Sequence, residues 1–254
     1  MGMRHQKGFT IIELSLFLAI SGLLAITLLT GWTTMINTQR YKDSIKTVQT
    51  FLQQQYTLVY NVQNGRNGST GCAVGPDGKP KFSDETEPAA AKAPGQSGCI
   101  VMGRYIHIRN GSEITVYPVV GIDSTSLSDP TDSDKDVMLD RQPVEIKNDL
   151  FLTQNDLDIP WQAQVVQAGS DNPMNLAIAI IRNPESGTVH TYVQRISSGL
   201  PAVSEVITNS DPGDTNICLD AGVPLAGGRM GVVIRAGASS QSFVQTISDS
   251  ERLC

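Results

Sequence analysis

One acidic residue, Glu13, lies at the edge of a long apolar segment, where a charge is costly in free energy. Between Glu13 and Arg40 the chain has no charged residue, and residues 14–36 are mainly Leu, Ile, Ala, Ser and Thr. As a helix these residues rise roughly 34 Å, enough to cross a hydrocarbon core about 30 Å thick. A carboxylate at the centre of a bilayer costs about 2.5–3.5 kcal/mol on insertion scales. The position of Glu13 at the edge of this run therefore predicts that it has a partner.

The residues around Glu13 carry a processing signature. The sequence KGFTIIEL at residues 7–14 ends a short basic start and opens the long apolar run. This arrangement resembles the cleavage and methylation signature of type IV pilins and pseudopilins, over about residues 4–36. The resemblance implies that a prepilin peptidase cuts after Gly8, that the new amino-terminal Phe9 is methylated, and that Glu13 is the assembly residue.

The chemistry of a charge pair fits this implication. Cleavage leaves an ammonium group on Phe9 in an apolar setting. An ammonium and a carboxylate that have both left water stabilise each other only when they are closely paired. In the family, the glutamate of an incoming subunit meets the terminal amine of its neighbour, which sets the axial register of the filament.

Two alternatives for the N-terminal segment remain open. The basic start and apolar run also fit a conventional secretory signal peptide or an uncleaved anchor. However, residues 30–39 read TGWTTMINTQ, without a small-x-small cleavage site. Under either alternative the protein would be a secreted or membrane-anchored extracellular binding domain.

The apolar run continues as an amphipathic helix. Beyond residue 36, apolar side chains recur at steps of three and four, at Tyr41, Ile45, Val48, Leu52, Tyr56, Val59 and Val62. A glycine stop is expected at Asn64-Gly65. After a cleaved leader at 1–8, we therefore expect one helix, with a transmembrane or filament-core part at 9–36 and an amphipathic part at 37–63.

The remainder is expected to be a β-rich globular domain. Residues 64–98 are rich in Gly, Pro, Ser and Ala and predict a loop. Within residues 99–254, strand-like patterns occupy 100–108, 114–120, 162–167, Asn175–Arg182, 188–196, 231–235 and 243–247. Turn signals at 110–111 and 183–187 predict hairpins. The expected fold class is α+β, with a long N-terminal membrane-spanning helix packed on a mostly antiparallel sheet, as in pilins.

All four cysteines lie beyond the apolar run, at Cys72, Cys99, Cys218 and Cys254. None forms a CxxC pair, and an even count downstream of an export segment predicts two disulfides outside the cytoplasm. Three pairings are possible, and free buried thiols are the alternative. Local loop closure favours Cys72–Cys99 and Cys218–Cys254, the second of which would close the C-terminal region, from about Asn216, as disulfides do in many pilins.

Little in the sequence indicates catalysis or a cofactor. The GxSxG, HExxH and phosphate-binding Gly-Lys-Ser/Thr motifs are absent, so we predict that the protein is not an enzyme. Asp211, Asp214 and Asp220 are a weak calcium candidate, because some pseudopilins bind calcium in a C-terminal loop. Residues 132–136, DSDKD, lack the glycine and glutamate of a calcium loop, and we expect a solvated loop there.

Charge and size narrow the expected role. Residues 63–254 hold 14 Lys and Arg against 23 Asp and Glu, and this acidic body argues against a dedicated nucleic-acid site. The resemblance implies a structural subunit of a type IV pilus-like or type II secretion-like filament, and the 27.3 kDa mass favours a minor pilin or pseudopilin. Its partners would be other pilin subunits, the prepilin peptidase, a membrane assembly platform and, before assembly, the lipid bilayer. The precursor would cross the cytoplasmic (inner) membrane once, and the filament would be extracellular or periplasmic.

Overall fold

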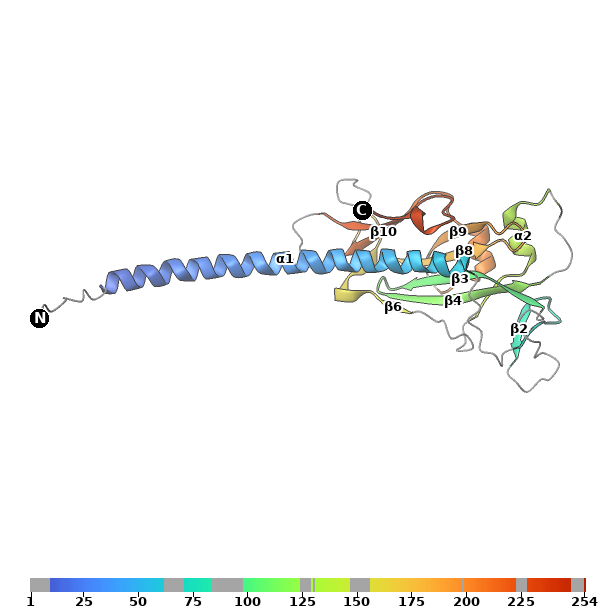
Figure 1. Cartoon of the computed structure of the whole chain (residues 1–254), viewed down its shortest axis with the longest axis horizontal. Helices are drawn as coiled ribbons and strands as arrows, with labels where there is room; N and C mark the ends of the chain where they lie inside the picture. The colour runs from blue at the N-terminus through green and yellow to red at the C-terminus, as the bar shows by residue number, and fades with distance from the viewer. Residues whose placement is uncertain are drawn as a thin grey trace, which may run out of the picture.

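A long helix and a body of sheets make up the molecule (Figure 1). The computed structural model describes residues 10–61, 71–83, 98–123, 129, 131–146, 156–197, 199–222, 228–247 and 254. Helix α1 (Ile11–Tyr60) has 50 residues and is continuous. Its first half extends away from the body and its second half lies along it (Figure 1). The helix is shorter than the expected range by one residue at each described end, because Thr10 and Asn61 cap it, and residues 9, 62 and 63 lie outside the described residues.

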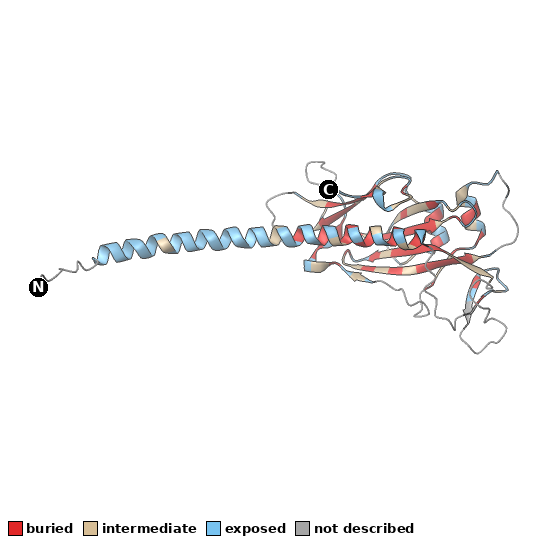
Figure 2. Ribbon diagram, in the orientation of Figure 1, coloured by how far each residue is buried: buried red, intermediate tan, exposed pale blue. Residues whose placement is uncertain are grey.

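The two halves of α1 differ in what surrounds them (Figure 2). Up to Ile36, every large apolar side chain of the helix is exposed, and Ile11 is 88% exposed. The Ser and Thr hydroxyls of this half donate to carbonyls three or four residues earlier, so they need no water. Beyond Arg40, the predicted apolar stripe is buried from Tyr41 to Val59, while Val62 lies outside the described residues.

In the described part of the body the strands form three antiparallel sheets. The largest has the order β5-β4-β3-β8-β9, with β6 also paired to β4. Its strands are β3 (Cys99–Arg109), β4 (Glu113–Ile122), β5 (Val144–Glu145), β6 (Leu157–Asp158), β8 (Asn175–Arg182) and β9 (Val189–Ile196). A four-stranded sheet has the order β12-β11-β10-β7, from β7 (Gln164–Val166), β10 (Thr215–Asp220), β11 (Met230–Ile234) and β12 (Val244–Ile247). The third sheet pairs β1 (Gly71–Val74) with β2 (Pro80–Ser83).

Helix α1 joins the two larger sheets through the main core. Its buried side chains, among them Leu52, pack in one cluster with Ile178 of β8 and Val232 of β11. The opposite face of the six-stranded sheet is covered by α2 (Asp134–Asp140) and α3 (Val203–Asn209). Strand β8 is therefore buried on both faces, which explains its uninterrupted apolar run. The α+β fold class is confirmed.

Both predicted hairpin turns are present. At the β3–β4 turn, Asn110 and Gly111 have φ of 51° and 70°, the left-handed values that a tight hairpin turn requires at both positions. Strands β8 and β9 pair antiparallel over their full length, on either side of residues 183–188.

Several described elements differ from the sequence expectations. Strand β10 occupies the start of the region expected as a disulfide-closed loop, because its apolar residues Ile217 and Leu219 enter the core. Helix α2 replaces part of the loop expected at 132–136, and α3 was not expected. Strands β1 and β2 form a hairpin within the range expected as loop, and the rest of that range up to residue 97 lies outside the described residues.

Candidate functional site

The N-terminal end of α1 is closed by a reciprocal pair of side chains. The Glu13 carboxylate accepts hydrogen bonds from the Thr10 backbone N–H and the Thr10 hydroxyl, both at 3.0 Å. The Glu13 N–H in turn donates to Thr10 Oγ1 at 3.3 Å. This is a capping box, which satisfies donors that a helix start would otherwise leave unpaired. A carboxylate in the first helical turn is also favoured by the helix dipole.

The surroundings of this pair are apolar. Ile11, Ile12 and Leu14 flank Glu13 and are exposed, so the carboxylate stands within a surface suited to lipid. Because these three neighbours are apolar, the bonds from Thr10 lower the cost of placing the carboxylate there. Gly8 and Phe9, the expected processing residues, lie outside the described residues.

The exposed half of α1 is the second component of the site. Among the described residues, α1 is the one helix long and apolar enough to cross a membrane. An exposed apolar surface of this size on a folded protein marks a site that meets lipid or other chains. The same helix therefore carries the Thr10–Glu13 pair at one end and the folded body at the other.

Both disulfides form with the pairings that loop closure favours. Cys72 of β1 is bonded to Cys99 at the start of β3, with Cα atoms 6.0 Å apart. Cys218 of β10 is bonded to Cys254, with Cα atoms 5.4 Å apart. The first fastens the β1–β2 hairpin to the large sheet, and the second fastens the chain end to the small sheet.

The three aspartates of the calcium candidate are not brought together as ligands. The Asp214 carboxylate accepts from the Ala236 N–H at 2.7 Å and from Arg235 at 2.8 Å. These bonds, the backbone one first, lower the pKa of Asp214. Asp220 lies in β10 opposite Gln164. Within the described ranges no group of three His, Cys, Asp or Glu residues is placed to hold a metal ion.

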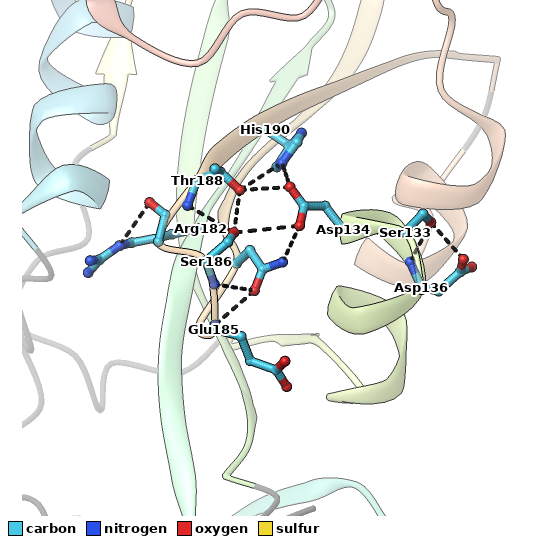
Figure 3. Close-up of polar contacts among 10 residues, drawn as sticks. Ser133, Asp134, Asp136, Arg182, Glu185, Ser186, Thr188 and His190 are labelled. Atoms are coloured by element: carbon cyan, nitrogen blue, oxygen red, sulfur yellow. Dashed lines mark hydrogen bonds and ion pairs between the residues drawn. The ribbon is translucent and has the colours of Figure 1, made fainter. Parts of the chain in front are cut away.

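A polar cluster that sequence reasoning missed surrounds Asp134 (Figure 3). Its carboxylate accepts from Asn183 at 2.7 Å and from the Thr188 hydroxyl at 2.8 Å, and lies 2.8 Å from His190 Nε2. These bonds, the one from Thr188 first, lower the pKa of Asp134. The sequence signal was Ser133, whose hydroxyl accepts from the Asp136 N–H and so begins α2.

The Asp134 cluster is a fastening between elements and lacks the geometry of a catalytic relay. In a nucleophile–histidine–carboxylate relay, the hydroxyl and the carboxylate engage opposite ring nitrogens of the histidine. Here the Thr188 hydroxyl, at 3.0 Å, and the Asp134 carboxylate both meet His190 Nε2. The cluster instead holds α2 against the β8–β9 hairpin.

Comparison with known proteins identifies the N-terminal segment. A family model described as the prokaryotic N-terminal methylation motif matches residues 3–29. The chain thus carries a type IV pilin-like prepilin signature, in the segment that includes Gly8, Phe9 and Glu13. No curated protein and no solved structure matches the chain.

The signature over residues 3–29 and the exposed half of α1 both support a type IV pilin-like protein. Both features fit a precursor that is anchored in a membrane. Proteins with this signature are structural, and in general they assemble with other pilin subunits after processing by a prepilin peptidase.

Proposed function

We propose that this protein is a structural subunit, a minor pilin or pseudopilin, of a type IV pilus-like or type II secretion-like filament. One observation carries the proposal: the methylation motif over residues 3–29 coincides with a helix half whose large apolar side chains are all exposed. Such a helix requires a bilayer before assembly and neighbouring helices after it. The 27.3 kDa mass of the whole chain favours a specialised rather than a bulk subunit.

Assembly in this proposal follows from the chemistry of the N-terminus. The prepilin peptidase cuts between Gly8 and Phe9, and the Phe9 amine is methylated. The amine of one subunit then meets the Glu13 carboxylate of the next at Oε1, because both bonds from Thr10 go to the other oxygen, Oε2. Pairing two desolvated opposite charges stabilises the docked subunit only when both are satisfied. The assembly platform and a separate ATPase supply the mechanical work, and the subunit itself catalyses nothing.

Replacement of Glu13 tests the assembly role. Glu13→Ala removes the carboxylate that pairs with a neighbour, so the variant should insert and be cleaved but be depleted at least tenfold from sheared filaments. Ser15→Ala is the matched control, because the Ser15 hydroxyl bonds only within its own helix, to the Ile12 carbonyl at 2.9 Å. Immunoblots of membrane and filament fractions measure both variants. Wild-type incorporation of Glu13→Ala would contradict the assigned role.

Intact mass of the mature chain tests the processing step. The proposal requires a chain that begins at Phe9 and carries one added methyl group, and Gly8→Val should leave the precursor uncut. Loss of about thirty residues or more from the precursor would instead indicate a conventional signal peptide.

A further inference from the structure

A cavity lies where α1 leaves the body. Its volume is about 250 Å³, and we call it the junction cavity. It lies between α1 and the 3-10 turn η1 (Pro160–Gln162), with the end of β10 on a third side. It is lined by Asn37, Arg40, Tyr41, Ser44, Trp161, Gln162, Ala163, Ala221 and Gly222. The cavity is therefore built from the first turns of α1 that meet the folded domain.

Arg40 and Trp161 contact each other in the lining of the junction cavity. The guanidinium carbon of Arg40 lies 4.8 Å from the centre of the Trp161 ring, a cation–π contact. A guanidinium in a cation–π contact can still donate its N–H groups to an acceptor. Among the described residues, no carboxylate pairs with Arg40. Trp161 is itself 54% exposed, which is unusual for so large an apolar side chain.

The backbone presents Trp161 at some cost. Trp161 and Gln162 have φ of 62° and 59°, left-handed values that residues other than glycine rarely adopt. A hydrogen bond from the Ser44 hydroxyl to the Pro160 carbonyl, at 2.9 Å, holds this turn against α1. The surrounding structure maintains this backbone strain, and the tryptophan is exposed. Together these two features point to a role for Trp161 in binding.

The position of the cavity along α1 places it at a membrane surface. The apolar run ends at Ile36, and Arg40 follows four residues later, about 6 Å further along the helix. The headgroup layer on each side of a bilayer has a similar thickness, since a bilayer of 40–45 Å has a core of about 30 Å. Of the two tryptophans in the chain, Trp161 lies beside Arg40, and Trp32 lies four residues before the end of the apolar run. They therefore lie on either side of the boundary between core and headgroups, the region that tryptophans favour.

The charge of the lining selects an anion. Arg40 is the first charged residue after Glu13, and the described lining contains no carboxylate although the body is acidic. The lining offers a guanidinium and two side-chain amides, on Asn37 and Gln162, which are donors suited to phosphate oxygens.

We propose that the junction cavity binds the phosphate of a phospholipid headgroup while the precursor is anchored in the bilayer. Arg40 and the amides hold the phosphate, and Trp161 rests among the headgroups and keeps the cavity at their depth. The inference rests on the membrane-anchored precursor and not on filament assembly. The test must distinguish a phospholipid from a neighbouring subunit as the occupant of the junction cavity.

The test uses the full-length precursor with Trp32→Phe, which leaves Trp161 as the only tryptophan. After reconstitution in vesicles of phosphatidylcholine and phosphatidylglycerol, a spin-labelled headgroup should quench Trp161 fluorescence. After extraction in mild detergent, native mass spectrometry should show bound phospholipid, reduced about tenfold in Arg40→Gln, because a charge-assisted bond is lost. Arg40→Lys keeps the charge without the planar fork, and should retain an intermediate amount.

Controls separate the headgroup from other sources of signal. Lys42→Gln removes an exposed charge from the same helix outside the cavity, and should retain lipid as the parent protein does. Inorganic phosphate at equal concentration should not displace the lipid. Three results would each overturn the proposal. The first is an equal loss of bound lipid in Arg40→Gln and Lys42→Gln, and the second is displacement of the lipid by inorganic phosphate alone. The third is that Trp161 becomes protected only where two copies of the chain meet. None of these readouts depends on filament incorporation, so a failure here leaves the proposed function standing.

Discussion

Asp134 shows how one carboxylate can join segments that are distant in the chain. It belongs to α2, while its partners Asn183, Thr188 and His190 belong to the β8–β9 hairpin, about fifty residues later. Beside this cluster, Arg141 at the other end of α2 pairs with Glu185 in the same hairpin. Two ends of a short helix are thus fixed by side chains, which compensates for the small number of bonds within the helix itself.

The Asp134 cluster predicts a pH-dependent stability. The pKa of Asp134 is lowered in the folded state, so its contribution is full above the unfolded pKa of about 3.9 and is lost as the pH falls through the folded pKa. Asp134→Asn should destabilise the body at pH 7 by about 1 kcal/mol, a value reduced for the partial exposure of the side chain. Denaturant unfolding at pH 7 and below pH 3 measures both effects.

Asp140→Asn, in the last turn of the same helix, is the control for this prediction. Asp140 is exposed, and its replacement should leave stability at pH 7 within about 0.5 kcal/mol of the parent. If Asp134→Asn is as stable as this control, the cluster does not fasten α2.

Among the larger elements, β3 and β8 approach each other unusually closely. Gly103 follows a register shift in β3 and faces Ile181 of β8. A Cβ atom at Gly103 would lie 2.0 Å from the Ile180 carbonyl oxygen. The backbone there has an ordinary φ, so the absence of a side chain, rather than conformational freedom, is what the site requires. The core strands of the large sheet depend on this contact.

Gly103→Ala should therefore destabilise the body. The methyl group would force two central strands apart, and we expect a loss of about 2–3 kcal/mol in the free energy of unfolding. Gly213→Ala is the matched control, because nothing lies within 4 Å of its Cβ position and no left-handed φ is required there. Urea titration of the full chain in detergent, followed by far-ultraviolet circular dichroism, gives both values. If Gly213→Ala is as unstable as Gly103→Ala, the destabilisation comes from replacing a glycine in general and not from the close contact between β3 and β8.

Hydrophobic patterns in the sequence predicted those helices and strands whose own residues determine their secondary structure. The apolar stripe of α1 and the run Asn175–Arg182 coincide with the structure because burial on one or both faces fixes their residue types. Helix α3, with sequence VSEVITN, is rich in β-branched residues and reads as a strand. It is helical because Val203, Val206 and Ile207 pack on the large sheet, a contact that no local pattern contains.

Pairings across the chain could be predicted only in part. The cysteine pairs were accessible because four residues allow three pairings and loop length favours one. The Asp134–His190 contact and the Arg40–Trp161 contact join residues far apart, with no such restriction on the choice of partner. The β10 strand was missed because Cys218 and the nearby aspartates resemble a loop, although its alternate residues enter the core.

For the whole molecule, the two disulfides act on different parts of the body. Cys72 and Cys99 belong to a small cluster with Val120 and Ile146, apart from the main core. Cys218 lies fully buried in β10, between β7 and β11. Loss of the first bond should release a hairpin, whereas loss of the second should loosen a central strand.

Removal of the second disulfide should therefore have the larger effect on global unfolding. Cys218→Ser with Cys254→Ser should lower the free energy of unfolding by about 3–4 kcal/mol, from the entropy that the closed loop removes from the unfolded chain. Cys72→Ser with Cys99→Ser should lower it by less, because the hairpin can detach while the core stays folded. Guanidinium unfolding of both double variants measures this, and an equal or reversed order would contradict the assignment.

The reciprocal bonds of Thr10 and Glu13 have a consequence for the energetics of polymerisation. Both bonds from Thr10 reach the same carboxylate oxygen, Oε2, and leave Oε1 open to a donor from another chain. Under the proposed assembly, one carboxylate would therefore hold the start of its own helix and the neighbouring chain at once. Docking would then add a contact at each N-terminus without first breaking the helix cap.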